Sequence, residues 1–168
     1  MKKKLTKAVF LDFDGVLFST VREAYAVSMI ALGRSDQALG INFKSAHYKW
    51  FNQYRYLIGP AWNYYYLIQS IDKKIAQLET DLELDFKKSL KILSQKEHFS
   101  FEGDFFCTRN YLRELDSDKW LKLIVPCSFV NELRGLFIQF PNSFFLVTTR
   151  DHESVDHILR SHQIRIPD

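Results

Sequence analysis

The feature that most restricts the fold is a short apolar run, Ala8 to Phe13, that ends in closely spaced carboxylates. It reads Ala-Val-Phe-Leu-Asp-Phe and is followed by Asp14-Gly15, a turn signal. Such a run is typical of a strand that is buried on both faces of a parallel sheet. A second run, Phe144 to Thr148, has the same character. Because helical patterns separate the two runs, the sequence predicts an α/β fold.

The middle of the chain has apolar residues at helical spacing. We expect a helix over 21–33, two helices that meet at Gly59-Pro60, a long amphipathic helix over 72–97, a loop at 101–104, and helices over 105–115 and 117–122. Helices over 128–139 and 153–162 and a third strand from 164–166 complete the pattern. The predicted organisation is an α/β core formed by 1–20 and 125–168, with an inserted helical unit over 21–124.

Asp12 and Asp14 are the candidate catalytic residues. A strand presents its last residues at the carboxyl edge of a sheet, where open α/β sheets bind ligands. Asp14 lies two residues on and therefore on the same side, and Gly15 allows a sharp turn beside them. Two close carboxylates need a neutralising cation, and hard oxygen ligands suit Mg²⁺. One carboxylate can attack phosphorus while its neighbour transfers protons. The alternative is a pair of ordinary loop carboxylates.

The segment Val9 to Leu17 resembles the first motif of the haloacid dehalogenase (HAD) superfamily, an apolar strand that ends in Asp-x-Asp. The resemblance implies a Rossmannoid parallel sheet and a phosphatase or phosphomutase rather than a dehalogenase. It implies that Asp12 forms an aspartyl-phosphate, and that Asp14 protonates the leaving oxygen and then activates water. It also implies Mg²⁺ bound by the Asp12 side chain and the Asp14 backbone carbonyl.

The run that ends at Thr148 resembles the second motif of that superfamily, an apolar strand that ends in Thr or Ser. Thr148 would donate its hydroxyl to a phosphoryl oxygen, and the amide of Thr149 could add a second donor. Arg150 could pair with phosphate bidentately, or it could form a surface salt bridge. We count Gly15 with these three as the phosphate-binding residues. The alternative for Thr148 is a strand-end or capping threonine.

Many members of the superfamily insert a helical cap after the first motif, and 21–124 would be that cap. Caps select the substrate, and the aromatic segment 48–66 is the candidate face. Within it, Arg55 is the candidate residue to reach an anionic or hydroxylated substrate. The alternative is that the aromatic side chains form the core of the cap itself.

The family pattern continues beyond this chain with a motif that supplies a Lys and a motif that supplies acidic metal ligands. Only 20 residues follow Thr148, and they contain no Lys. Asp151, Glu153 and Asp156 are read as helix-start charges. We therefore expect an incomplete sheet, a truncated form of a longer protein, and little activity. Exposed apolar faces and edges would favour a homo-oligomer or a domain swap.

The sequence predicts a Mg²⁺-dependent phosphohydrolase that acts on a small phosphorylated metabolite. The alternative is a non-catalytic module that binds a phosphorylated ligand or a protein partner. The net charge of +3 gives no argument for nucleic acid. No apolar stretch approaches the roughly 18 residues that cross a bilayer, so we expect no membrane partner and a cytoplasmic protein.

Overall fold

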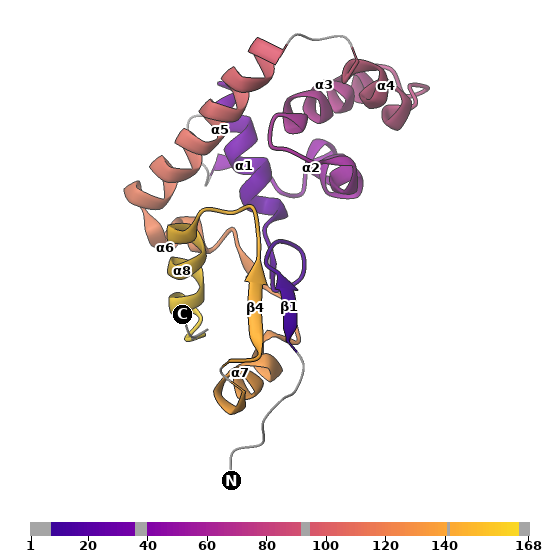
Figure 1. Cartoon of the computed structure of the whole chain (residues 1–168). Coiled ribbons are helices and arrows are strands. Elements are labelled where there is room, and N and C mark those ends of the chain that lie inside the picture. The colour runs from indigo at the N-terminus through magenta and orange to yellow at the C-terminus, as the bar shows by residue number, and fades with distance from the viewer. Residues whose placement is uncertain (1–7, 36–39, 92–94, 141, 165–168) are drawn as a thin grey trace. The chain divides into compact units, whose positions relative to one another are not determined.

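The computed structural model describes residues 8–35, 40–91, 95–140 and 142–164 (Figure 1). The chain divides into two compact units. Unit 1 is formed by Met1–Thr20 and Leu121–Asp168, and unit 2 by Val21–Trp120. Unit 1 holds the strands and unit 2 is helical, so the fold is mixed α/β. No helix in the described part of the chain is both long and apolar enough to cross a membrane.

Unit 1 contains a parallel pair formed by β1 (Val9–Asp12) and β4 (Phe144–Val147), which lie side by side in Figure 1. Both strands were expected from the sequence. A second pair was not expected: β2 (Phe18–Ser19) runs antiparallel to β3 (Val125–Pro126). Helix α7 (Val130–Gln139) precedes β4, and α8 (His152–Ser161) follows it.

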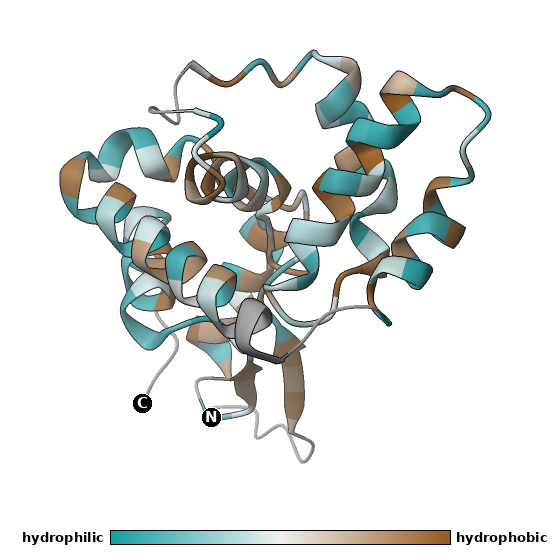
Figure 2. Cartoon of the chain, turned by 90° about the horizontal axis from the view of Figure 1, so that it is seen from above, coloured by the Kyte–Doolittle hydropathy of each residue, from teal (hydrophilic) through white to brown (hydrophobic). Residues whose placement is uncertain are grey.

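One face of the parallel pair is apolar and open to solvent. Phe10, Phe145 and Val147 are 67%, 46% and 59% exposed, and the rings of Phe10 and Phe145 stack at 5.4 Å. Both strands are coloured as hydrophobic in Figure 2. Parallel sheets are normally covered on both faces. The expectation that so small a sheet leaves an apolar face exposed is confirmed.

The carboxyl end of α8 closes with a tight turn. His162 follows the helix, Gln163 has a positive φ of 56°, and the Ile164 amide donates to the Leu159 carbonyl at 2.8 Å. Ile164 is buried, and residues 165 and 166 of the expected third strand lie outside the described residues.

Unit 2 is built from helices that pack in pairs. They are α1 (Val21–Ala31), α2 (Ala46–Tyr54), α3 (Asn63–Ala76), α4 (Leu82–Ser89), α5 (Gln95–Leu115) and α6 (Ser117–Leu121), with a short 3₁₀ helix at Arg55–Leu57. Helix α1 packs on α5 and α2, and α3 packs on α2 and α4. The rings of Phe51, Tyr64 and Phe105 stack in a row at 5.5 and 5.3 Å. These three side chains are buried, as core residues of the unit should be.

The prediction of a single long helix over 72–97 is wrong. Helix α3 ends at Ala76, where Gln77 turns to an extended conformation, and α4 begins at Leu82. The Asp81 carboxylate accepts a hydrogen bond from the Leu84 amide at 3.1 Å and thereby caps α4. A capping aspartate satisfies a backbone amide that has no partner within the helix, which favours a helix start at this point.

The prediction of a loop at 101–104 is also wrong, because these residues lie within α5. Gly103 lies inside the helix, where glycine costs about 1 kcal/mol relative to alanine. Phe101 and Phe105 are four residues apart, so they share one face of the helix, and both are buried. Their burial offsets the glycine, since burying a Phe contributes roughly 1.5–3 kcal/mol.

Three helices of unit 2 are joined by a chain of polar side chains that is buried at Tyr25 and partly exposed at Asp72. The Tyr25 hydroxyl lies 3.0 Å from His47 Nδ1, and His47 Nε2 lies 3.2 Å from an oxygen of Asp72. Arg34 pairs with the other oxygen of Asp72 at 2.6 Å. Burial lowers the pKa of His47 and outweighs the opposing pull of Asp72.

Candidate functional site

Asp12 and Thr148 lie at the same edge of the parallel sheet, where β1 and β4 end. The register pairs Asp12 with Val147, and Thr148 is the next residue after Val147. Asp12 is exposed, and its Oδ1 accepts a hydrogen bond from the Phe13 amide at 2.7 Å. This bond fixes one carboxylate oxygen, so Oδ2 is the oxygen that remains for a ligand. The two predicted motifs therefore meet at the carboxyl edge.

The turn after Asp12 is tight. Gly15 has a φ of +83°, and its amide donates to the Phe18 carbonyl at 2.7 Å. The Leu17 and Phe18 amides both donate to the Phe13 carbonyl, at 3.1 and 3.0 Å. A Cβ at Gly15 would meet nothing within 4 Å, so the backbone conformation, and not space, favours glycine. The expected sharp turn is present, and it engages the amide of Gly15, a residue counted among the phosphate-binding candidates.

Asp14 forms an ion pair with Arg150. Arg150 Nη2 and Nε lie 2.9 and 3.2 Å from Asp14 Oδ1, and Nε lies 3.4 Å from Oδ2. The Arg150 side chain is only 2% exposed and the Asp14 side chain 26%. Arg150 therefore forms a salt bridge, but its own side is buried and not at the surface as expected, and its contact with phosphate stays a prediction. Because the residues are 136 positions apart, no local pattern could indicate this contact.

Arg150 also contacts Thr148. Its backbone amide donates to Thr148 Oγ1 at 3.1 Å. A hydroxyl that accepts a hydrogen bond can still donate its own proton, so Thr148 remains able to bind a phosphoryl oxygen. Thr149 between them is exposed. Arg150 thus joins the second motif to the acid of the first.

The described residues offer few ligands for Mg²⁺. The Asp12 carboxylate is exposed, but the Asp14 carboxylate is engaged by Arg150. No group of three or more His, Cys, Asp or Glu in the described part of the chain could hold a metal ion. The cation that neutralises Asp14 in this structure is a guanidinium. A Mg²⁺ ion would therefore depend on Asp12, the Asp14 backbone carbonyl, water and the oxygens of a phosphate.

The acidic residues after the second motif lie at the start of α8, except Asp156, which lies within the helix. Asp151 Oδ1 accepts a hydrogen bond from the Ser154 amide at 2.8 Å. Asp156 pairs with Arg160 at 2.8 Å, and Glu153 is exposed. The reading of these residues as helix charges is confirmed for Asp151, which is the N-cap.

Arg55, the residue expected to reach a substrate, lies in unit 2. Its guanidinium carbon is 5.0 Å from the centre of the Tyr64 ring, within the range of a cation–π contact. Arg55 is partly exposed. This contact places the guanidinium, the group that would bind an anionic substrate, against the aromatic core of unit 2, and the substrate role stays a prediction.

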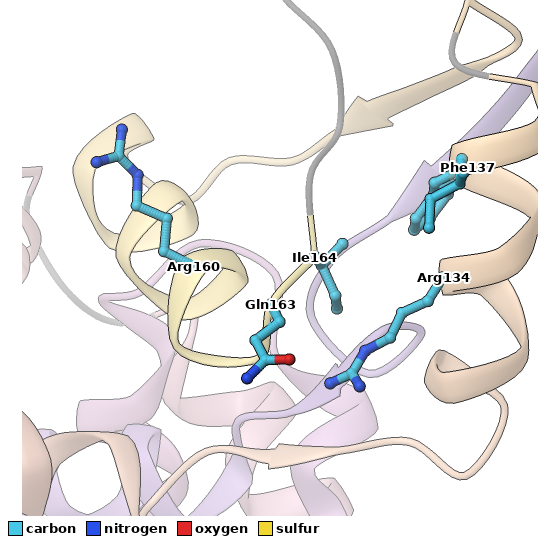
Figure 3. Close-up of a pocket in the computed structure, with 6 residues that line it drawn as sticks. Arg134, Phe137, Arg160, Gln163 and Ile164 are labelled. Carbon is cyan, nitrogen blue, oxygen red and sulfur yellow. The ribbon is translucent and has the colours of Figure 1, made fainter.

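A cavity of about 320 Å³ lies elsewhere in unit 1, between α7 and the end of α8 (Figure 3). Phe137 and Ile164 line it together with Arg134 and Gln163, whose ends point toward one another. Arg134 Nη2 donates to the His162 carbonyl at the end of α8, where a cation opposes the partial negative charge of the helix. Arg134 is thereby explained as a helix cap, and none of the predicted site residues lines the cavity.

The chain was compared with protein-family models, with curated proteins and with solved structures, and none of the three comparisons found a match. The resemblance to the HAD superfamily therefore depends on the two motifs alone, and it stays a prediction.

Proposed function

We propose that the chain is a phosphohydrolase that acts on small phosphorylated metabolites through an aspartyl-phosphate at Asp12. The observation that carries the proposal is the meeting of the two motifs at one sheet edge, with Asp12 exposed and Thr148 one residue beyond its register partner. A carboxylate, a hydroxyl donor and a second carboxylate then belong to one site, as phosphoryl transfer requires.

In the proposed reaction Asp12 Oδ2 attacks phosphorus, and the bond between phosphorus and the ester oxygen breaks. Asp14 gives a proton to the departing oxygen. Water then attacks the aspartyl-phosphate and passes a proton to Asp14, which restores Asp12 and releases inorganic phosphate. The Thr148 hydroxyl and the Thr149 amide donate to the phosphoryl oxygens.

Mg²⁺ belongs to this proposal as a cofactor that would neutralise charge on the phosphoryl group. Asp12 and the Asp14 backbone carbonyl would hold it. Since the described residues supply no third acidic ligand, we expect weak Mg²⁺ binding and slow turnover.

The test is hydrolysis of p-nitrophenyl phosphate in Mg²⁺ at high protein concentration. We expect slow release of nitrophenol that Asp12→Asn abolishes and that Asp156→Asn leaves unchanged. Asp156 is a suitable control because it is an aspartate of unit 1 whose partner is the exposed Arg160. Hydrolysis that survives Asp12→Asn contradicts the proposal.

A second candidate is a module that binds a phosphorylated ligand without hydrolysing it. The small number of acidic ligands among the described residues favours this candidate, because hydrolysis would depend on a weakly held Mg²⁺. Calorimetry with inorganic phosphate separates the two. Binding without any Asp12-dependent hydrolysis supports the module, and hydrolysis excludes it.

A further inference from the structure

We propose that Arg150 is a positioning residue for Asp14 and not a ligand of the phosphoryl group. This inference rests on the proposed function, because it concerns the step in which Asp14 transfers a proton. It assigns Arg150 a different role from the phosphate contact that the sequence suggested.

Arg150 holds the two carboxylate oxygens of Asp14 unequally. Oδ1 receives both Nη2 and Nε of Arg150, at 2.9 and 3.2 Å, whereas Oδ2 receives only Nε, at 3.4 Å. Because a hydrogen bond weakens with distance, Oδ1 is the more firmly held oxygen of Asp14 and Oδ2 is the less constrained one. A guanidinium fork fixes the plane of the carboxylate as well as its position.

Arg150 is itself held on several sides. Its backbone amide contacts Thr148 Oγ1, its guanidinium carbon lies 5.9 Å from the centre of the Phe13 ring, and its side chain is 2% exposed. The guanidinium is enclosed, and it directs Nε and Nη2 at Asp14. The arrangement aligns the proton carrier with the hydroxyl that binds the phosphoryl group.

A variant that loses proton transfer can be told from one that loses phosphate binding by comparing its rates on two substrates with different leaving groups. Protonation of the leaving oxygen matters greatly for a poor leaving group such as benzyl alcohol, and little for p-nitrophenol, which leaves as a stable anion. A phosphate ligand contributes to both substrates alike and affects KM.

The experiment compares benzyl phosphate with p-nitrophenyl phosphate for the wild-type chain, Arg150→Ala, Arg150→Lys and Asp14→Asn. For Arg150→Ala we expect kcat to fall about 100-fold on benzyl phosphate and less than about 3-fold on p-nitrophenyl phosphate, with KM unchanged. Arg150→Lys keeps the positive charge but lacks the planar guanidinium, so its kcat should also fall more on benzyl phosphate than on p-nitrophenyl phosphate, by a smaller factor. If Arg150→Ala fails to fold by circular dichroism, Arg150→Lys carries the test.

Two further variants sharpen the comparison. The double variant Asp14→Asn with Arg150→Ala should be no slower than Asp14→Asn, because Arg150 acts through Asp14. Arg160→Ala removes a 78% exposed arginine of the same unit, and it should change neither substrate.

The outcomes separate the two claims. Equal losses on both substrates, or a raised KM, overturn the role of Arg150 and leave the phosphohydrolase standing. A wild-type chain that shows no Asp12-dependent hydrolysis overturns both.

Discussion

The buried ion pair between Glu23 and Arg109 in unit 2 gives a sharp prediction about stability. Arg109 Nε lies 2.7 Å from Glu23 Oε1, and Nη2 lies 3.3 Å from Oε2. Glu23 is fully buried and the Arg109 side chain is 9% exposed. The pair joins α1 to α5, two helices that pack on each other. The guanidinium also lies 4.9 Å from the centre of the Phe105 ring.

Replacing Arg109 with methionine keeps much of the volume but removes the guanidinium that pairs with the buried Glu23 carboxylate. Breaking a buried pair in this way costs about 3–5 kcal/mol, a large part of the roughly 5–15 kcal/mol that stabilises a domain. Replacing both residues with methionine removes both charges, and we expect the double variant to lie within about 2 kcal/mol of the wild type.

Urea denaturation followed by tryptophan fluorescence measures this difference in unit 2 alone. All three tryptophans, Trp50, Trp62 and Trp120, belong to unit 2. With a urea slope of about 2 kcal/mol per molar, the single variant should lower the midpoint by roughly 1.5–2.5 M. A loss below about 1 kcal/mol for Arg109→Met, or a double variant as unstable as the single one, refutes the reasoning.

Three further predictions concern single contacts. Burial lowers the pKa of His47, so the unfolded chain binds a proton more readily than the folded chain. Unit 2 should keep its full stability above the ordinary histidine pKa of 6.5 and lose stability as the pH falls below it. Urea midpoints measured against pH should show this trend in the wild-type chain and not in His47→Gln. Asp151→Ala removes the bond to the Ser154 amide and should cost about 1 kcal/mol of unfolding free energy by circular dichroism, whereas Asp151→Ser should recover most of it. Gln163→Gly relieves the positive φ of 56° and should raise the stability of unit 1 by about 1 kcal/mol, and a lower melting temperature would contradict this.

The strands that carry the site could be predicted because their signal is local. A short apolar run bounded by turn residues identifies β1 and β4 without any knowledge of the rest of the chain. The carboxyl edge of a parallel sheet then brings Asp12 and Thr148 to the same side, as the register shows. The pair β2 and β3 has only two residues in each strand, which is too short for any periodicity to indicate.

The errors in unit 2 arose where packing and capping compete with periodicity. Apolar residues continue at helical spacing across the gap between α3 and α4, so spacing alone could not reveal the break that the Asp81 cap sets. A loop was predicted at 101–104, but Phe101 and Phe105 bury one face of a continuous helix. The capping aspartate was visible in the sequence, whereas the packing was not.

The contact between Asp14 and Arg150 is the part of the site that could not be predicted from the sequence. Both residues were candidates, yet the sequence assigned the neutralising charge to Mg²⁺ and left two roles open for the arginine. The folded chain brings Arg150, two positions after Thr148, within hydrogen-bond distance of Asp14.

A crystal structure of the chain soaked with Mg²⁺ and beryllium trifluoride, a mimic of the phosphoryl group, tests the central claim most directly. The account predicts density joined to Asp12 Oδ2, with the Thr148 hydroxyl donating to a fluorine and Arg150 still on Asp14. Density bound at any other residue, or an Asp12 carboxylate that stays bare at saturating beryllium trifluoride, would contradict it.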